Sequence, residues 1–227
     1  VGSHGTYKCE NVTSITLPET IETIEKSSFR DAQVAKITIP KNVSKIEPTA
    51  WLSMKAIPEF EVVAENHYFD SDNDGVLYTE NKEDLRAVPS NIAEKKGETY
   101  TIDASVKSIN KAAFHMNPGL KKVVLPPNLE TVEEGWPSIA GTSELEAFVE
   151  PTTPGTTKFE VIDGVLVRKA PTPKRLVLYP HAKNVTDYTV PAGVEEIASY
   201  AIAGNRNITS IDLKDVTKVQ ISALVNL

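Results

Sequence analysis

Hydrophobic and polar positions along this chain follow a mask that recurs at intervals of about 22 residues. A clear copy reads Ile37-Thr38-Ile39-Pro40, followed by Val43, Ile46 and the pair Ala50-Trp51. The alternation in Ile-Thr-Ile predicts a strand with one buried face, and the proline predicts its end because it has no N–H to donate. Val43 and Ile46 predict a second short strand. The small-then-large pair predicts a turn whose large side chain fills the centre of a coil.

Six copies of the mask are present, and their strand triplets begin at Ile15, Ile37, Tyr100, Val123, Tyr188 and Ile211; the fourth triplet has an apolar residue, Val124, in the middle. Two copies are weaker. The fourth has Gly135-Trp136-Pro137 in place of the small-then-large pair, and the sixth lacks the proline. The large residues of the clear copies are predicted to be buried at equivalent positions: Phe29, Trp51, Phe114 and Ile202. A mask repeated in this way predicts a solenoid, in which each coil packs on its neighbours.

Two inserts of roughly forty residues separate the copies into three pairs. In the first, Gly75–Thr79 and Leu85–Val88 are strand-like around a polar connection; Gly164–Val167 and Leu176–Tyr179 occupy the same places in the second. This pattern is typical of a β-hairpin.

We therefore expect one β-rich array over residues 1–227, in which six coils are interrupted by two β-hairpin inserts. The coils are predicted at about 12–55, 97–137 and 185–227, and the inserts at about 56–96 and 138–184. Short strands are expected to alternate with turns or 3₁₀ segments, because no helix of typical length fits between them. We also expect the chain to be a fragment of a longer protein.

Composition and charge exclude several classes of function. Of the 227 residues 40% are hydrophobic, the formal net charge is -7, and the basic residues are scattered, which argues against a nucleic-acid partner. No apolar run approaches the roughly 18 residues of a membrane span. Cys9 is the single cysteine, which excludes an intramolecular disulfide and a thiolate zinc cluster.

Acidic motifs are the main candidates for metal or catalytic chemistry. The run from Asp70 to Gly75 matches the first half of a calcium-binding EF-hand loop, with Asp70, Asp72 and Asp74 alternating. The twelfth position is Asn81 rather than the required glutamate, so we predict a polar turn and no calcium.

Other candidate groups also lack the spacing of a site. The four histidines are far apart, and three glutamates near Val132 and two near Ile197 are predicted to be the solvated side of short strands: Glu130, Glu133, Glu134, Glu195 and Glu196. The sequence therefore predicts no enzyme, no cofactor and no metal.

The pattern Ile-x-Ile-Pro-x-x-Val-x-x-Ile with a following Ala-aromatic pair, together with the Asp-Gly-Val-Leu-Tyr inserts, resembles the BspA-type leucine-rich repeat proteins. The resemblance covers roughly Val12 to Leu224. It implies a curved right-handed solenoid on a secreted or surface-displayed protein, mostly from host-associated anaerobic bacteria. Adhesion to host proteins or other cells is the role proposed for some members, so an extracellular or cell-surface location is expected.

The function predicted on these grounds is a non-enzymatic adhesion module that binds a host or cell-surface protein through an extended solenoid face. A glycan-binding module, with exposed aromatic platforms such as Tyr68, Tyr78 or Trp136, and a structural spacer for another domain stay open as alternatives. Strand alternation points one residue of each triplet outward, and stacking aligns these residues in a column that we predict to bind the partner. The column consists of Thr16, Thr38, Thr101, Val124, Thr189 and Asp212.

Overall fold

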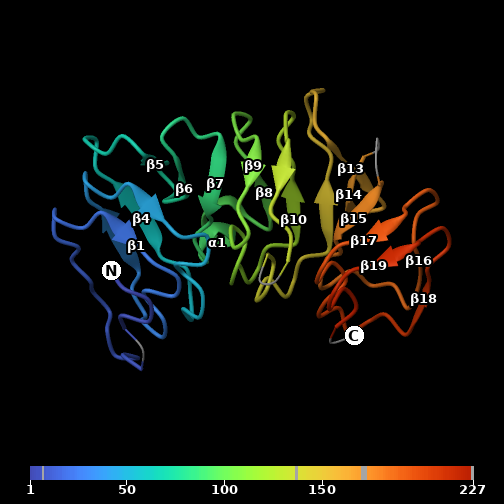
Figure 1. Cartoon of the computed structure of the whole chain (residues 1–227), viewed down its shortest axis with the longest axis horizontal. Helices are drawn as coiled ribbons and strands as arrows, with labels where there is room; N and C mark the ends of the chain where they lie inside the picture. Colours follow the sequence, from blue (N-terminus) through green and yellow to red (C-terminus); the bar gives the residue numbers. More distant parts are fainter. Residues whose placement is uncertain (7, 136–137, 170–172, 226–227) are drawn as a thin grey trace.

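The structure, a computed structural model, describes residues 1–6, 8–135, 138–169 and 173–225. It is a β-solenoid in which short strands follow one another along the array, with the two termini at opposite ends (Figure 1). Turns connect the strands, and the described residues contain one helix, α1 (Ile92–Lys96), and no 3₁₀ segment. Neither the length nor the apolar character that a membrane crossing requires is found in a helix of the described chain. The predicted solenoid is confirmed.

The first strand of each coil, which we term the A strand, contains the apolar-polar-apolar triplet. The A strands are β2 (Lys36–Ile39), β4 (Glu59–Val62), β8 (Thr99–Thr101), β10 (Lys122–Val124), β12 (Ala147–Val149), β16 (Asp187–Thr189) and β18 (Ser210–Asp212). They pair in parallel, and the pairing sets equal mask positions side by side, as for Ile37 and Phe60. In the first coil, residues 15–17 occupy this place without forming a strand.

The second strand of each coil, the B strand, is shorter in most coils. The B strands are β1 (Thr23–Ile24), β3 (Lys45–Ile46), β7 (Asp84–Ala87), β9 (Ser108–Ile109), β11 (Thr131–Val132), β15 (Arg175–Leu178), β17 (Glu196–Ile197) and β19 (Lys218–Val219). They also pair in parallel between neighbouring coils.

The described residues form about eight coils rather than six, because each insert is itself a coil. Strands β4 and β7 provide the A and B strands of coil 3, and β12 and β15 provide those of coil 6. Both predicted hairpins are present, since β7 pairs antiparallel with β6 (Leu77–Thr79) and β15 with β14 (Val165–Arg168). A third antiparallel strand extends each hairpin, β5 (Phe69–Ser71) in coil 3 and β13 (Phe159–Ile162) in coil 6. The hairpins therefore widen two coils without interrupting the array.

The hairpin coils change how neighbouring coils are joined. Among the described strands, β4 pairs with β2 and not with β8, whereas β7 pairs with β9 and not with β3. Coil 6 repeats the arrangement, because β12 pairs with β10 and β15 with β17. Each hairpin coil is thus joined to the preceding coil by its A strand and to the following coil by its B strand.

The predicted anchors fill the interior. Phe29, Trp51, Phe114 and Ile202 are all buried, which confirms the register of the clear copies. The Trp51 ring stacks on Phe29 with centroids 5.3 Å apart and lies 4.7 Å from Phe60 of the next coil. In the weak fourth copy the buried anchor is Ile139, preceded by the small residue Ser138. In that copy the buried anchor therefore lies two residues further along the chain than in the clear copies. Residues 136–137 of the copy lie outside the described part of the chain.

Both hairpins are buried on two faces, which explains their continuous apolar runs. In β14, Val165 and Val167 belong to the core of the last coils, whereas Leu166 belongs to the core of the middle coils. The turn before each hairpin strand approaches its own A strand closely. Gly75 has a φ of +78°, and a Cβ there would lie 2.7 Å from the Cβ of Glu59. Glycine is required at this turn because both the conformation and the space exclude a side chain.

Candidate functional site

The outward side chains at the middle position of each triplet follow one another along the array, in register within each of the three A-strand sheets, and we term them the strand face. Parallel pairing sets Thr101 beside Val124, and Thr189 beside Asp212. Five of the six predicted positions are exposed: Thr16, Thr38, Thr101, Thr189 and Asp212. Strand alternation therefore places these side chains outward as expected. Whether the column binds a partner stays a prediction.

Val124 departs from the expectation, because its side chain is buried with 7% of its surface exposed. It lies on β10, the middle strand of a three-stranded sheet, between Thr101 on one side and Val149 on the other. Since both sides of the strand are occupied by neighbours in register, its short branched side chain is flanked on both sides and offers little contact surface.

The strand face also contains two residues that the sequence analysis missed, Glu61 and Val149. The register sets Glu61 beside Thr38 and Val149 beside Val124. Both residues belong to the A strands of hairpin coils, which were taken for inserts. The strand with Glu61 alternates, whereas that with Val149 is apolar throughout; no proline follows Val62, and a glutamate separates Val149 from Pro151. The alternation in Glu59–Val62 was the available signal.

Polarity changes along the strand face. At its first end, Glu61 accepts a hydrogen bond from Thr38 Oγ1 at 3.2 Å and pairs with Lys36 at 3.0 Å, and these contacts lower the pKa of Glu61, with the Lys36 contact first. Its middle is formed by uncharged, mostly branched side chains. At the far end Asp212 pairs with Lys214 at 2.9 Å, which lowers the pKa of this carboxyl. The face therefore offers an uncharged centre of short side chains between two charged regions.

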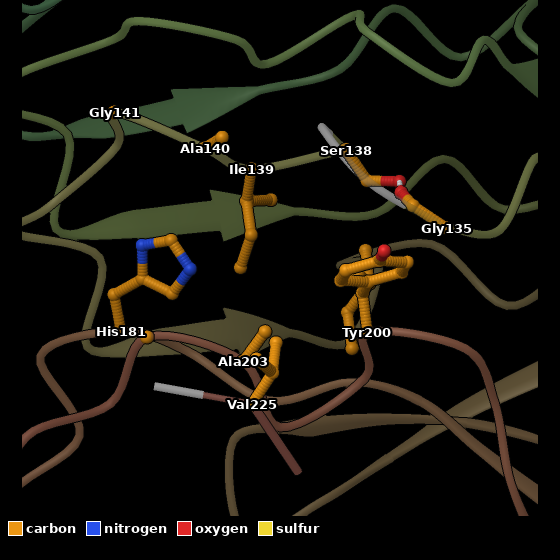
Figure 2. A pocket seen from close by; sticks show the side chains of 11 residues that line it. Gly135, Ser138, Ile139, Ala140, Gly141, His181, Tyr200, Ala203 and Val225 are labelled. Atoms are coloured by element: carbon orange, nitrogen blue, oxygen red, sulfur yellow. Dashed lines mark hydrogen bonds between the residues drawn. The ribbon is translucent and has the colours of Figure 1, made fainter. Parts of the chain in front are cut away.

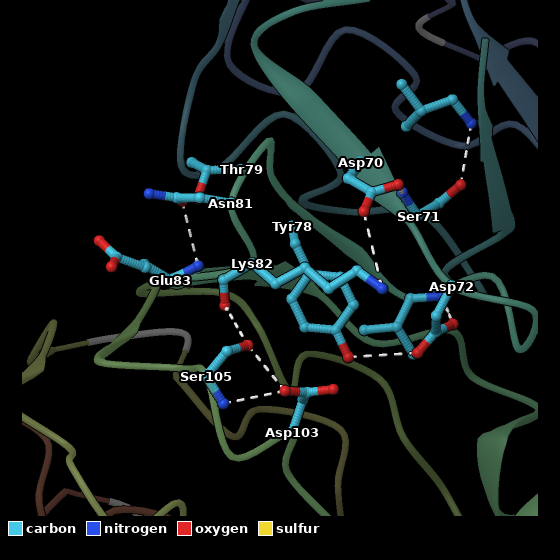
Figure 3. A network of polar contacts seen from close by, with 12 residues as sticks. Asp70, Ser71, Asp72, Tyr78, Thr79, Asn81, Lys82, Glu83, Asp103 and Ser105 are labelled. Carbon is cyan, nitrogen blue, oxygen red and sulfur yellow. Dashed lines mark hydrogen bonds and ion pairs between the residues drawn. The ribbon is translucent and has the colours of Figure 1, made fainter. Parts of the chain in front are cut away.

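The acidic run of the first hairpin is occupied by internal contacts (Figure 3). Asp70 lies 3.6 Å from Lys82 Nζ, Asp72 accepts hydrogen bonds from the backbone amides of Asp74 and Val76, and Asp74 pairs with Lys96 at 2.7 Å. Within the described ranges no three metal-ligating side chains converge. The three carboxylates therefore face separate partners rather than a common centre.

Two buried tyrosines lie beside this run. The Tyr78 hydroxyl donates to Asp72 at 3.2 Å and lies 3.4 Å from that of Tyr100. Burial raises the pKa of both phenols, so neither ionises near neutral pH. The hairpin loop is further held by Ser105, whose hydroxyl contacts the Lys82 carbonyl at 3.2 Å and Asp103 at 2.7 Å. This network holds the hairpin on coil 4.

A cavity of about 370 Å³ lies between the turns of coils 5 and 7 (Figure 2). Ile139, Ala203 and Val225 give it an apolar lining, with His181 and Tyr200 at its sides. Burial lowers the pKa of His181, which keeps the imidazole neutral at neutral pH. The Ser138 hydroxyl, the one Ser or Thr hydroxyl of the described lining, donates to the Gly135 carbonyl at 2.5 Å rather than to this histidine. The lining therefore lacks the paired nucleophile and base of acyl-transfer chemistry.

The glutamates near the B strands differ from the expectation in part. Glu196 is buried, with 9% of its surface exposed, and it accepts a hydrogen bond from Arg175 Nε at 2.9 Å. Arg175 also donates to both carboxylate oxygens of Glu134, at 3.1 and 3.0 Å, and Lys218 lies 3.3 Å from Glu196. Burial would raise the pKa of Glu196, but the bonds from Arg175 and Lys218 outweigh it and lower the pKa. The solvated reading was wrong for Glu196, because the parallel register brings Arg175 beside it.

The three aromatic residues suggested as glycan-binding platforms differ in solvent exposure. Tyr68 is exposed over 54% of its surface, whereas Tyr78 is buried and cannot form a platform. Trp136 lies outside the described residues. Among the described phenylalanine, tryptophan and tyrosine residues, Tyr68 is the one with an exposed side chain.

The repeat, its registers and the hairpin coils define a leucine-rich-repeat solenoid. The profile of the BspA type leucine-rich repeat region matches residues 1–73, 91–150 and 178–226 in six copies. The chain therefore belongs to the BspA-type leucine-rich repeat family. The unmatched stretches contain most of the hairpin residues. No curated protein matches the chain.

Solved structures share the fold. The pneumococcal vaccine antigen PcpA superposes with a TM-score of 0.59 at 20% identity, over 91% of this chain and 48% of its own. A leucine-rich repeat protein from Eubacterium ventriosum gives a TM-score of 0.56 at 15% identity, over 95% of this chain and 65% of its own. The chain thus spans about half the length of the pneumococcal antigen.

Proposed function

We propose that this chain is a non-enzymatic binding module, located outside the cell or on its surface, that contacts a macromolecular partner through the strand face. The observation that carries the proposal is the row of outward, mostly short side chains on the A strands, which are in register within each of three parallel sheets. A smooth face of this kind fits a broad protein surface, whereas a small metabolite needs a concave pocket. The charged residues Glu61 and Asp212, on either side of the uncharged centre, add electrostatic selectivity.

Membership in the BspA-type family supports the proposal, because repeat solenoids offer extended binding surfaces. The description of the pneumococcal relative as a vaccine antigen is consistent with a surface location for that protein, and we extend the location to this chain as part of the proposal. The absence of a nucleophile, base and acid constellation at the cavity between coils 5 and 7 favours binding over catalysis.

The test replaces Thr38, Thr101 and Thr189 together by arginine and measures binding to immobilised collagen, fibronectin and laminin. We expect loss of whichever interaction the unmodified chain shows, because three long side chains rise above the short residues on which the partner would rest. A matched control variant has arginine at Thr13, Thr152 and Thr153, which are exposed outside the A strands. We expect this variant to bind as the unmodified chain does. A folded Thr38/Thr101/Thr189 variant that binds as well as the control contradicts the assignment of the strand face. So does an unmodified chain that binds none of the three proteins.

A further inference from the structure

A second surface lies at the side of the solenoid, where the A strands turn into the B strands. Here a groove of about 480 Å³ is lined by coils 2 and 3, together with Glu22 of coil 1 and the exposed His67 of coil 3. One wall is the turn between β2 and β3, with Lys41, Asn42 and Ser44, and the other is the segment between β4 and β5, with Glu65 and Tyr68. None of these residues belongs to the strand face, so the groove is a separate surface.

One buried side chain holds the two walls together. Asn66 Nδ2 donates to the carbonyls of Pro40 and Val43 in the first wall, at 2.8 and 3.0 Å. Its Oδ1 accepts from the backbone amides of Tyr68 and Phe69 in the second wall, at 2.8 and 2.9 Å. The Tyr68 carbonyl accepts a further bond from the Glu80 amide at 3.0 Å. Because these bonds fix both backbones, the groove exists before any ligand binds, and binding costs little ordering entropy.

Tyr68 gives the groove its chemical character. More than half of Tyr68 is exposed although its backbone is fixed on both sides, so the phenol ring presents an apolar surface to water from an anchored position. Around it, Glu22 and Glu65 provide carboxylate acceptors and Lys41 an ammonium donor, and Asn42 provides an amide whose Nδ2 also donates to the Glu19 carbonyl at 2.7 Å. A pyranose sugar has the matching form, because it combines an apolar C–H face with hydroxyl groups that donate and accept around its rim. The two carboxylates disfavour an acidic sugar through like-charge repulsion.

The chain contains an internal counterpart that lacks the aromatic ring. Asn205 makes the same four bonds, to the carbonyls of Pro180 and Lys183 at 3.0 Å each and from the amides of Asn207 and Ile208 at 2.9 and 3.1 Å. A groove of about 470 Å³ lies beside it. There Asn207 stands in the place of Tyr68. The four hydrogen bonds of the buried asparagine therefore have a structural role in both places. The exposed Tyr68 ring is what distinguishes the groove of coils 2 and 3.

We infer that the groove between coils 2 and 3 binds a neutral pyranose unit of a glycan, with Tyr68 stacked on the sugar and the polar rim bonded to its hydroxyls. The inference is independent of the protein partner assigned to the strand face. Glycan binding at the side and protein binding at the strand face can be lost separately, which makes the two proposals distinguishable.

The experiment uses saturation-transfer NMR with the methyl glycosides of glucose, galactose, mannose and N-acetylglucosamine. We expect transfer to the ring C–H protons of at least one of these sugars, retained by Tyr68→Phe and weakened about tenfold or more by Tyr68→Ala, as for the truncation of an aromatic contact at a binding site. The control Asn207→Ala removes the equivalent residue of the other groove and leaves the transfer unchanged. Thermal melting tests whether each variant is folded. We expect the melting temperature of Tyr68→Ala to stay close to that of the unmodified chain, because the Tyr68 ring is exposed.

Two results overturn the inference. One is the absence of transfer to any of the four sugars. The other is equal transfer with the unmodified chain and a folded Tyr68→Ala variant.

Discussion

The two places where the array passes into a hairpin coil solve the same structural problem in different ways. At the first junction, between coils 2 and 3, strands β3 and β7 do not pair, and at the second, between coils 5 and 6, strands β11 and β15 do not pair. Arg86 bridges the first gap by a hydrogen bond to the Ile46 carbonyl, beside the aromatic contacts of Trp51. Arg175 bridges the second gap by its bidentate contact with Glu134.

The difference begins at one register position. Asp84 starts the B strand of the first hairpin coil and pairs with Ser108, whereas Arg175 starts that of the second and pairs with Glu196. The next residue in the second register is Lys218, so charges alternate from Glu134 through Arg175 and Glu196 to Lys218. The first junction therefore depends mainly on apolar packing, and the second on a charge ladder across four coils. Salt and pH act on the second kind of contact far more than on the first.

The largest effect is expected from Trp51→Ala at the first junction. The substitution removes a buried ring that contacts both Phe29 and Phe60, so it weakens the packing of three consecutive coils. We expect the free energy of unfolding to fall by about 3–5 kcal/mol, measured by urea denaturation.

The matched substitution is Ile139→Ala, which truncates the corresponding anchor of the coil before the second junction. Its cost is expected near the lower end, about 2 kcal/mol, because the side chain is smaller and lines an existing cavity. An equal or larger loss for Ile139→Ala would show that apolar packing does not distinguish the two junctions.

The bridging arginines give a second comparison, whose larger loss is expected at the lower end of that for Trp51→Ala. Arg175→Met leaves Glu134 and the buried Glu196 without their main partner, at a cost of about 3 kcal/mol in the free energy of unfolding. Arg86→Met removes one hydrogen bond to a carbonyl and the contact with Asp84, at a cost of about 1–2 kcal/mol. Urea denaturation of both variants gives the comparison. If Arg86→Met costs as much as Arg175→Met, the charge ladder has no special role.

The turn glycines give a third, smaller comparison. Gly75 and Gly164 both have a positive φ, but a Cβ at Gly75 would lie 2.7 Å from Glu59, whereas one at Gly164 would lie 3.1 Å from Ala147. Alanine should therefore cost about 2 kcal/mol at Gly75 and about 1 kcal/mol at Gly164. Thermal melting of the two variants measures the order, and the reverse order would contradict the tighter approach at the first hairpin.

Much of this fold was predictable because the decisive signals are local. Apolar alternation, a terminating proline and a small-then-large pair identify a coil without knowledge of its neighbours, and they placed Phe29, Trp51, Phe114 and Ile202 correctly. The hairpins were also visible as paired apolar runs. The coil count was not, because a hairpin separates the A strand of coils 3 and 6 from its B strand, and no proline directly follows these A strands.

The candidate sites were less predictable, since they depend on which coils become neighbours. Alternation alone placed Thr38 and Thr101 outward, but the burial of Val124 follows from its middle position in a sheet. Glu61 joins the strand face only when coil 3 is recognised as a coil. The groove beside Tyr68 depends on hydrogen bonds from Asn66 to Pro40 and Val43, which lie more than twenty residues earlier in the chain. No local sequence pattern predicts these bonds.

Acid provides the last comparison, between Glu196 of the charge ladder and Glu61 of the strand face. The pKa of each carboxyl is lowered in the folded protein, so the unfolded chain takes up a proton at higher pH than the folded chain does. The stability that each contributes is therefore complete above the ordinary glutamate pKa and is lost as pH falls through the folded value. Replacing Glu196 by glutamine should flatten the fall in unfolding free energy below about pH 4.5, measured by urea denaturation at successive pH values.

High salt should distinguish the contribution of Glu196 to the pH dependence of stability from that of Glu61. The Glu61 carboxylate is 55% exposed, and that of Glu196 only 11%, so ions screen the first contact and hardly reach the second. In 1 M sodium chloride we expect Glu61→Gln to leave the pH dependence unchanged, while Glu196→Gln still flattens it. If salt abolishes the effect of Glu196→Gln as well, the ladder behaves as a set of surface pairs, and the second junction must owe its stability to the same apolar packing as the first.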